Sequence, residues 1–185
     1  MEDRELIRRI QNGQKEYLDE IAAKYYDDIY YFCCYQTGNG EDAYDLTQET
    51  FCRFIRYVEN YQYRNLKGYL LTIAMNLCRD YMRTTMSTRR VELSIEQVEH
   101  GDVSENRTMI ERKEQGTSSE NAILLAEALL ELPDIQREAV LLHHFYGYKN
   151  REIARMTGVS YVAVKSRVRQ GIQKLSRLLD QKDFL

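Results

Sequence analysis

Apolar residues recur at intervals of three and four positions along most of the chain, which is the pattern of amphipathic helices. No segment shows the alternation of apolar and polar positions that is typical of a half-buried strand. The sequence therefore predicts an all-α fold. The expected helices lie near residues 4–12, 17–35, 41–59, 66–83, 121–132 and 134–145, with two more within 150–179.

The helical pattern stops in the middle of the chain. Residues 84–120 are polar and lack a sustained apolar stripe, and a short helix or an extended segment near residues 91–98 both stay open. A compact domain rarely contains a structureless loop of this length, so we expect two small helical domains joined by a polar linker. The predicted ranges are 1–85 for the first domain, 86–120 for the linker and 121–185 for the second domain.

Two helices of the first domain combine an apolar face with a polar one. In the helix at 41–59 we expect a core stripe of Ala43, Leu46, Thr50, Phe54 and Val58, with Phe51 and Ile55 beside it. The opposite face of that helix carries Asp45, Gln48, Glu49, Arg53 and Arg56. In the helix at 66–83 the polar side carries Thr72, Asn76, Arg79 and Arg83.

The chain shows no signature of an enzyme or of a metal site. Its four cysteines lie in apolar stretches without CxxC spacing, which favours small, reduced core residues at Cys33, Cys34, Cys52 and Cys78. The adjacent His143 and His144 diverge by about 100° on a helix, which suits a partly exposed face better than a shared metal. No Gly-rich phosphate loop or nucleophile elbow occurs, so we expect no catalytic residue, no metal and no cofactor.

Charge is unevenly distributed along the chain. The total of 26 basic and 29 acidic side chains gives a net charge of −3, yet residues 149–177 carry eight basic side chains against Glu152 alone. A concentration of this kind is typical of nucleic-acid binding. No segment approaches the roughly 18 apolar residues that a membrane span needs, and the amino terminus is charged. We therefore expect a cytoplasmic protein without membrane insertion.

Residues 150–169, NREIARMTGVSYVAVKSRVR, have the pattern of a helix-turn-helix. Ile153 and Val164 are expected to pack between the two helices, where the small Ala154 permits a close approach. Gly158 occupies the turn, because a positive φ angle costs little only for glycine. Ser160 is placed to cap the second helix. A basic helical face that is merely solvated is the alternative, which the turn chemistry and the charge disfavour.

Outside its apolar stripe, the second of these helices carries polar, cationic and apolar side chains that are not committed to the core. An α-helix fits the major groove of DNA, which is about 12 Å wide, and polar side chains there bond phosphates or base edges. For Lys165 and Arg169, phosphate contact and base contact both stay open. The candidate DNA-binding residues are Tyr161, Val162, Lys165, Ser166, Arg169 and Gln170.

Three segments resemble one family. LPDIQREAVLLHHFYGYKNREIARMTGVSYVAVKSRVRQGIQKLSRLL (132–179) is similar to the promoter-binding domain of extracytoplasmic-function sigma factors, group IV of the sigma-70 superfamily, although LuxR-type response regulators carry a related domain. EDAYDLTQETFCRFIRYVENY (41–61) resembles that family's polymerase-binding helix. NLKGYLLTIAMNLCRDYMR (65–83) resembles its promoter-opening segment. The resemblance implies a sigma2-like helical bundle followed by a sigma4-like helix-turn-helix domain.

The resemblance also implies partners and roles. RNA polymerase core would be bound through the clamp helices of its largest subunit and through the flap, with a contact face of Asp45, Gln48, Glu49 and Arg53. The melted proximal promoter element would meet Tyr61, Tyr63, Tyr69, Asn76, Arg79, Asp80 and Arg83. The family often has tryptophan near residues 54–56 and at 69, and this chain has none, which leaves the details of base capture open. An anti-sigma factor is the further expected partner.

These features predict a bacterial sigma factor that directs promoter recognition and transcription initiation and is not itself an enzyme. The alternative is a helix-turn-helix transcriptional regulator whose amino-terminal helices form a sensing or dimerisation module. A helical interaction module without nucleic-acid function is disfavoured by the basic carboxy-terminal part of the chain.

Overall fold

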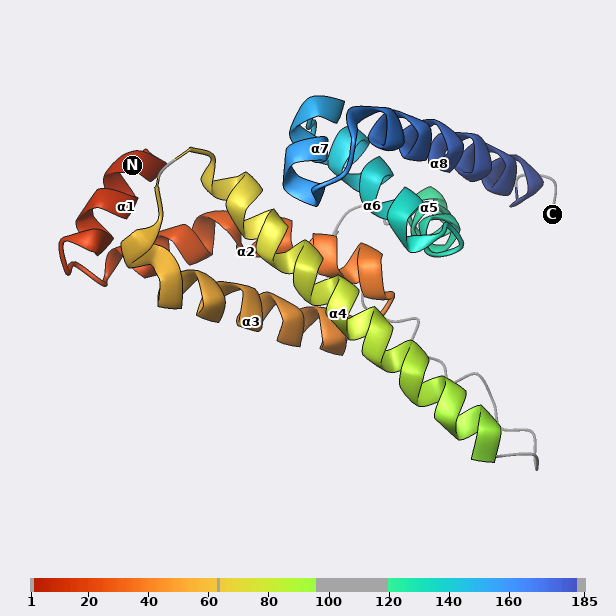
Figure 1. Cartoon of the computed structure of the whole chain (residues 1–185), viewed down its shortest axis with the longest axis horizontal. Coiled ribbons are helices and arrows are strands. Elements are labelled where there is room, and N and C mark those ends of the chain that lie inside the picture. The colour runs from red at the N-terminus through yellow and green to blue at the C-terminus, as the bar shows by residue number, and fades with distance from the viewer. Residues whose placement is uncertain (1, 63, 96–119, 183–185) are drawn as a thin grey trace. The chain divides into compact units, whose positions relative to one another are not determined.

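The computed structural model describes residues 2–62, 64–95 and 120–182. Within these residues every regular element is a helix, which confirms the predicted all-α fold (Figure 1). None of the helices in this part of the chain combines the length and the apolar character needed to cross a membrane. Most of the predicted linker, residues 96–119, lies outside the described residues, so its conformation stays a prediction.

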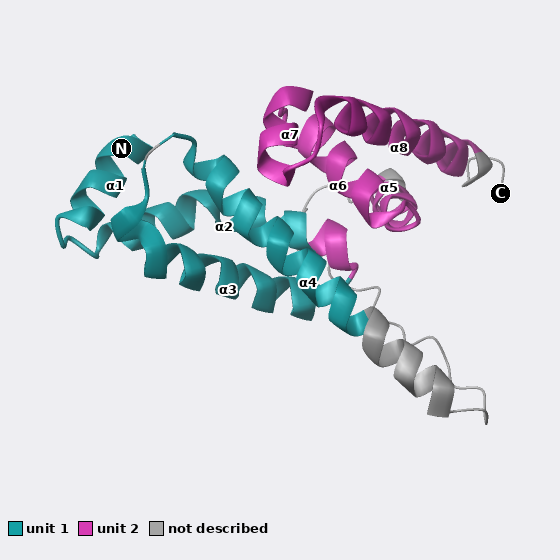
Figure 2. Cartoon of the chain, in the orientation of Figure 1, with its two compact units in different colours: residues 1–33, 39–109 teal, residues 34–38, 110–185 magenta. Residues whose placement is uncertain are grey.

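The chain divides into two compact units, shown in different colours in Figure 2. The first unit comprises residues 1–33 and 39–109, and the second comprises residues 34–38 and 110–185. The pattern of two cores, expected from the polar middle of the sequence, is therefore present in the structure.

The first unit begins with α1 (Asp3–Gln11) and most of α2 (Tyr17–Thr37), whose residues 34–37 belong to the second unit. It continues with α3 (Gly40–Tyr57), the short 3-10 helix η1 (Val58–Asn60) and α4 (Leu66–Ile95). The sequence predicted that α4 would end near residue 83. Residues 84–95 lack an apolar stripe, but they also contain neither glycine nor proline, so nothing in their local chemistry ends the helix.

The core of the first unit is built from the apolar stripes of its four α-helices. A nine-residue helix such as α1 is marginal alone, so the burial of its Leu6, Ile7 and Ile10 is what holds it on the unit. Helix α3 packs on α4 and buries Ala43, Thr47, Thr50 and Phe54, and Val58 is buried in η1 directly after it. The two threonine hydroxyls donate to carbonyl oxygens one turn earlier, at 2.6 and 2.7 Å, which satisfies them in the core.

Two core predictions on α3 are wrong. Ile55 is 47% exposed, and Cys52 is exposed, whereas the other three cysteines are buried as predicted. At about 100° per residue, Ile55 lies about 100° away from the centre of the buried stripe, beyond the edge that Phe51 occupies. The buried face of α3 is therefore narrower than the apolar pattern indicated.

The second unit is a set of helices in which one predicted helix is interrupted. It contains α5 (Glu120–Leu130), α6 (Asp134–Val140), the π-helical turn η3 (Leu141–Phe145), α7 (Asn150–Thr157) and α8 (Tyr161–Lys182). The sequence predicted a single helix over 134–145. In η3 the Tyr146 N–H donates to the Leu141 carbonyl five residues earlier, at 3.1 Å. The five residues of this segment, LLHHF, do not by themselves distinguish the α-helical from the π-helical hydrogen-bond pattern.

Arg137 ties α5 to α6 from inside the core of the second unit. Arg137 is only 4% exposed, and its guanidinium donates to the carbonyl oxygens of Leu129 and Leu132, each at 3.1 Å. It also pairs with Asp134 at 2.7 Å. A buried cation is tolerated when all its donors find partners in this way. The carbonyls at the end of α5 are satisfied by the same contacts.

Candidate nucleic-acid and protein interfaces

The helix-turn-helix has the predicted turn chemistry. Ile153 of α7 and Val164 of α8 are each 1% exposed at the packing of the two helices. Gly158 adopts φ 71°, the left-handed conformation that ends α7. The Ser160 hydroxyl oxygen accepts from the Ala163 N–H at 3.2 Å and caps α8. The conformation of Gly158 and the cap at Ser160 therefore fix the direction in which α8 begins after the turn.

The outward surface of α8 is exposed at nearly every predicted DNA-binding position. Val162 is 74% exposed, which is unusual for a β-branched apolar residue and suits contact with a thymine methyl group. Ser166 is half-buried. Gln170 accepts a hydrogen bond from Gln136 of α6 at 3.2 Å, so part of its amide is already engaged. The remaining positions that face solvent are Tyr161, Lys165 and Arg169.

The basic side chains around this surface keep their charge uncompensated. Within residues 120–182, no ion pair is formed by Lys165, Arg167 or Arg169. Three cations on one helix, without local carboxylate partners, produce a positive potential at the exposed end of the motif. This electrostatic arrangement suits a polyanion such as the DNA backbone.

The predicted protein-binding face lies on α3. Asp45 and Gln48 are exposed, and Glu49 pairs with Arg53 at 2.8 Å along the helix. An exposed pair of this kind contributes roughly 0–1 kcal/mol to stability, so its charges are available to a partner at little cost.

Two apolar side chains that the sequence did not assign to this face accompany it. Tyr44 is 51% exposed, and Ile55 is 47% exposed. Exposed aromatic and aliphatic side chains next to polar ones are common in protein interfaces. The signal that could have identified Tyr44 is its position outside the expected core stripe of α3.

An aromatic pair lies where the chain passes from α3 to α4. The rings of Tyr61 and Tyr69 have centroids 4.6 Å apart at an interplanar angle of 34°, and Phe54 meets Tyr69 edge-on at 6.4 Å. Both tyrosines are half-buried. Tyr63, the third predicted base-contacting tyrosine, lies outside the described residues. Half-exposed aromatic rings of this kind can stack on an unpaired base.

Gln11, at the end of α1, holds the backbone beneath this pair. Its side-chain nitrogen donates to the carbonyl oxygens of Val58 and Tyr61, each at 2.9 Å. Asn65 caps α4 on the other side of the loop by accepting from the Gly68 N–H at 3.0 Å. The segment that carries Tyr61 is thus fixed at both ends. Sequence reasoning missed Gln11 because its partners lie 47 and 50 residues away.

The polar side of α4 continues from Tyr69. Asn76 is exposed, Arg79 is half-buried with its guanidinium against the Met75 sulfur at 3.5 Å, and Asp80 pairs with Arg83. From Tyr69 to Arg83 the helix rises by about 21 Å at 1.5 Å per residue. The structure therefore brings the predicted proximal-element residues of α4 onto one face, with the Tyr61 ring at its beginning.

The two histidines of η3 do not form a metal site. His143 is half-buried, with Nδ1 2.8 Å from the Tyr148 carbonyl oxygen, and His144 is exposed. Partial burial, and secondarily the neighbouring His143, lower the pKa of His144 below its ordinary value. Within the described part of the chain, no three His, Cys, Asp or Glu side chains group as metal ligands would.

Comparison of the sequence with known proteins identifies the family of this chain. The family model described as sigma-70 region 2 matches residues 21–88, and that described as sigma-70, region 4 matches residues 122–175. The ECF RNA polymerase sigma factor EcfG of Rhodopseudomonas palustris is 36% identical over 77% of this chain and 74% of its own length. This chain belongs to the ECF RNA polymerase sigma factors.

Other ECF sigma factors match over more of the chain but extend beyond it. BldN of Streptomyces coelicolor is 32% identical over 95% of this chain, and SigE of Mycolicibacterium smegmatis is 34% identical over 85%. The matched regions make up 65% and 59% of these two relatives.

Solved structures have the same fold. The sigma factor RpoE from Bartonella quintana, in complex with the anti-sigma factor NepR, aligns with a TM-score of 0.67 at 23% identity, over 88% of this chain and 96% of its own. CnrH, in complex with the cytosolic domain of CnrY, aligns with a TM-score of 0.66 at 23% identity, over 97% of each chain. The helical architecture is thus that of a solved sigma factor.

The matches cover the candidate surfaces. The region 2 match contains α3, the Tyr61–Tyr69 pair and the polar side of α4, and the region 4 match contains the helix-turn-helix. The resemblance to a sigma factor, inferred from sequence motifs, is confirmed at the level of the family. The roles of single side chains stay predictions.

Proposed function

We propose that this chain is a promoter-recognising initiation factor of bacterial RNA polymerase. One observation carries the proposal: a single chain presents a cationic, exposed helix-turn-helix in one unit, and an aromatic and polar face next to a protein-binding helix in the other. Residues 1–85 hold polymerase and melted DNA, residues 121–185 hold duplex DNA, and residues 86–120 link them. Polymerase performs the chemistry, so the chain supplies no catalytic residue.

Duplex recognition is assigned to the exposed side of α8. Lys165, Arg167 and Arg169 attract phosphates, while Tyr161 and Val162 present apolar surface to base edges. Each phosphate that is neutralised contributes a slope of roughly −0.9 in the dependence of log affinity on log salt concentration. Upstream-element binding should therefore be strongly weakened by salt.

Promoter melting is assigned to α4 and the loop before it. A base released from the duplex stacks on the Tyr61–Tyr69 pair, and Asn76, Arg79 and Arg83 bond the exposed strand. Stacking of one base on an aromatic side chain is worth roughly 1–3 kcal/mol, which offsets a large part of the cost of unpairing it.

Polymerase binding is assigned to α3, with Asp45, Gln48, Glu49 and Arg53 as its polar contacts on the clamp helices of the largest subunit. The flap of polymerase is the second contact. The solved sigma factor RpoE is in complex with the anti-sigma factor NepR, and we extend that kind of partner to this chain as a regulator that covers its polymerase-binding surfaces. The proposed place of action is the cytoplasm, together with polymerase and DNA.

Transcription from a matched promoter with purified core polymerase tests the proposal. Promoter-dependent RNA should appear only when the chain is added. DNA binding without any initiation would instead favour a helix-turn-helix regulator with another kind of amino-terminal module. The region 2 match over residues 21–88 disfavours that alternative.

The division of labour has its own test. Replacing both Lys165 and Arg169 with alanine should weaken upstream-element binding by roughly 10- to 100-fold and leave core binding unchanged. Arg177→Ala is the matched control, because Arg177 is an exposed cation further along the same helix. Loss of core binding together with DNA binding in the double variant would contradict the assignment.

A further inference from the structure

Two buried cysteines of the first unit lie side by side. The Sγ atom of Cys33 on α2 is 3.8 Å from the Sγ atom of Cys78 on α4, although the two residues are 45 positions apart along the chain. Cys33 is 0% exposed and Cys78 is 3% exposed, and both are thiols in the structure. Neither residue belongs to the faces assigned to polymerase or to DNA, so the proposed function leaves this pair unused.

The two sulfur atoms are at contact distance, and a short movement would bring them to bonding distance. A disulfide bond has an S–S length of about 2.05 Å, so the sulfur atoms of Cys33 and Cys78 would have to approach by about 1.8 Å. Each Sγ atom moves when its side chain turns about the Cα–Cβ bond, so part of this approach needs no movement of the backbone. Cys34 is not an equivalent partner, because it points about 100° away from Cys33 around α2.

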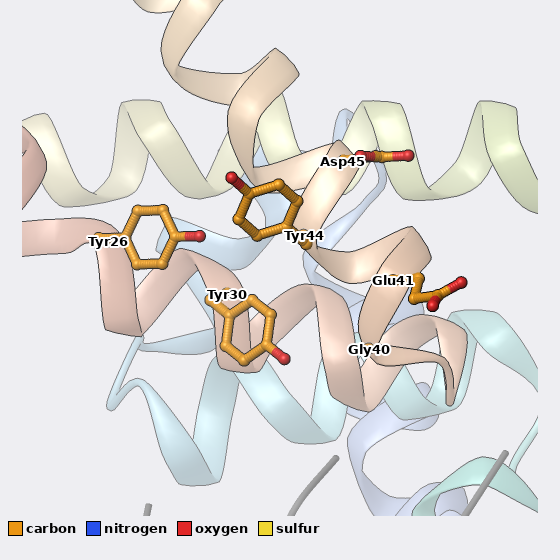
Figure 3. Close-up of a pocket in the computed structure, with 6 residues that line it drawn as sticks. All are labelled: Tyr26, Tyr30, Gly40, Glu41, Tyr44 and Asp45. Atoms are coloured by element: carbon orange, nitrogen blue, oxygen red, sulfur yellow. The ribbon is translucent and has the colours of Figure 1, made fainter. Parts of the chain in front are cut away.

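Helix α2 is held against both of its neighbours by contacts away from the cysteines. On one side, the rings of Tyr26 and Tyr30 on α2 line the same surface hollow as that of Tyr44 on α3 (Figure 3). On another side, Asp28 of α2 pairs with Lys67 of α4 at 2.8 Å. These contacts keep α2 in place, so the sulfur atoms on α2 and α4 stay within reach of each other.

We propose that a peroxide converts Cys33 and Cys78 into a disulfide that links α2 to α4 inside the folded first unit. One thiol loses its proton and attacks an oxygen atom of hydrogen peroxide; the O–O bond breaks, and the hydroxide that leaves takes up the proton as water. The second thiol attacks the sulfur of the resulting sulfenic acid, so the S–S bond forms, the S–O bond breaks and a second water leaves. The two thiols give up two protons and two electrons, which reduce one peroxide to two waters.

Burial makes this reaction slow and selective. A peroxide must enter during a local opening of the unit, so the buried pair should react more slowly than the exposed Cys52. Once one sulfur is a sulfenic acid, the other thiol is already beside it, and this proximity favours the disulfide over reaction with a second peroxide. The link lies in the core, so the exposed faces of α3 and α4 stay as they are in the reduced chain.

Peptide mapping of the oxidised full chain tests the pair. Trypsin leaves three of the four cysteines in the peptide 25–53 and Cys78 in the peptide 68–79. The chain is therefore prepared with Cys34→Ala and Cys52→Ser, treated with hydrogen peroxide and digested without a reductant. The two peptides should be joined, with a mass two hydrogen atoms below their sum, and dithiothreitol should separate them. Oxidation to sulfinic acid without joined peptides, or no oxidation at all, would overturn the proposal.

The matched control keeps Cys34 in place of Cys33. This second chain carries Cys33→Ala and Cys52→Ser, and Cys34 is adjacent to Cys33 and buried at 6% exposure. In the native state its two peptides should be joined at least about 10-fold less than those of the first chain, because the sulfur atom points elsewhere. In concentrated urea, where the helices are lost, both chains should be joined alike. Equal joining in the native state would show that the fold does not select the pair.

Resistance to unfolding tests whether the link fits the folded unit. A cross-link between positions this far apart restricts the unfolded chain, and it stabilises the native state when the native geometry is not distorted. On oxidation of the Cys34→Ala, Cys52→Ser chain, the urea midpoint of the first unit, measured by hydrogen exchange of the α3 amides, should rise by about 1–2 M and return with dithiothreitol. An unchanged or lower midpoint in the linked chain would contradict the proposal. None of these measurements needs polymerase, so they are independent of the proposed function.

Discussion

Gly171 lies where α8 packs on α6, and replacing it with alanine should destabilise the second unit. A Cβ atom at this position would lie 2.6 Å from Cγ2 of Val140 and 3.3 Å from the carbonyl oxygen of Gln136. Carbon atoms in favourable contact are about 3.5–4.0 Å apart, so the first distance is a clash of about 1 Å. Because α8 also carries the proposed DNA-binding surface, its packing on α6 places that surface relative to the rest of the unit.

Two opposing effects set the magnitude. Alanine is favoured over glycine in a helix interior by about 1 kcal/mol. Overpacking of a well-filled core costs about 1–3 kcal/mol, and Val140 is fully buried and β-branched, so it has little freedom to rotate away. We expect the clash to prevail, with a net loss in the free energy of unfolding of about 1–2 kcal/mol.

A double-mutant cycle isolates this contact. Gly171→Ala, Val140→Ala and the double variant of the full chain are compared by hydrogen exchange of the α8 amides in increasing urea, which reports the unfolding of the second unit. In the Val140→Ala background the clashing methyl group is gone, so Gly171→Ala should become stabilising, by up to about 1 kcal/mol from helix propensity. If Gly171→Ala stabilises the otherwise wild-type chain, or has the same sign in both backgrounds, the steric reasoning is refuted.

Three further predictions concern other parts of the molecule. Gln11→Ala removes two hydrogen bonds to the backbone at Val58 and Tyr61, each worth about 1 kcal/mol. Promoter opening, measured by 2-aminopurine fluorescence, should therefore weaken while core binding is retained. Unchanged opening would show that α1 has no part in placing the loop that carries Tyr61. Ser160→Ala removes the cap of α8 and should lower the stability of the second unit by about 1 kcal/mol in thermal unfolding, whereas a shift near zero would mean that water replaces the cap. In the native chain a thiol reagent such as Ellman's reagent should modify Cys52 rapidly, and rapid modification of more than one thiol would contradict the burial of Cys33, Cys34 and Cys78.

Much of the fold could be predicted from the sequence because it depends on local properties. The interval between apolar residues identifies a helix wherever it lies, so all the α-helices of the described residues were expected, most within a few residues of their ends. The turn at Gly158 and the cap at Ser160 are set by the conformational freedom of one residue and the reach of one hydroxyl. The predicted polar faces of α3 and α4 follow from the same helical geometry, which orders side chains around an axis whatever the axis packs against.

The tertiary structure decided which parts of those faces are covered. Ile55 is as apolar as its buried neighbours, but only the placement of the other helices leaves it exposed, and the same is true of Cys52. Gln11 meets Tyr61 across 50 positions of sequence, and the ring of Tyr26 on α2 stacks on that of Phe51 on α3. Periodicity gives the direction of a side chain around its own helix; what that side chain meets depends on segments distant along the chain, and packing alone brings those segments together.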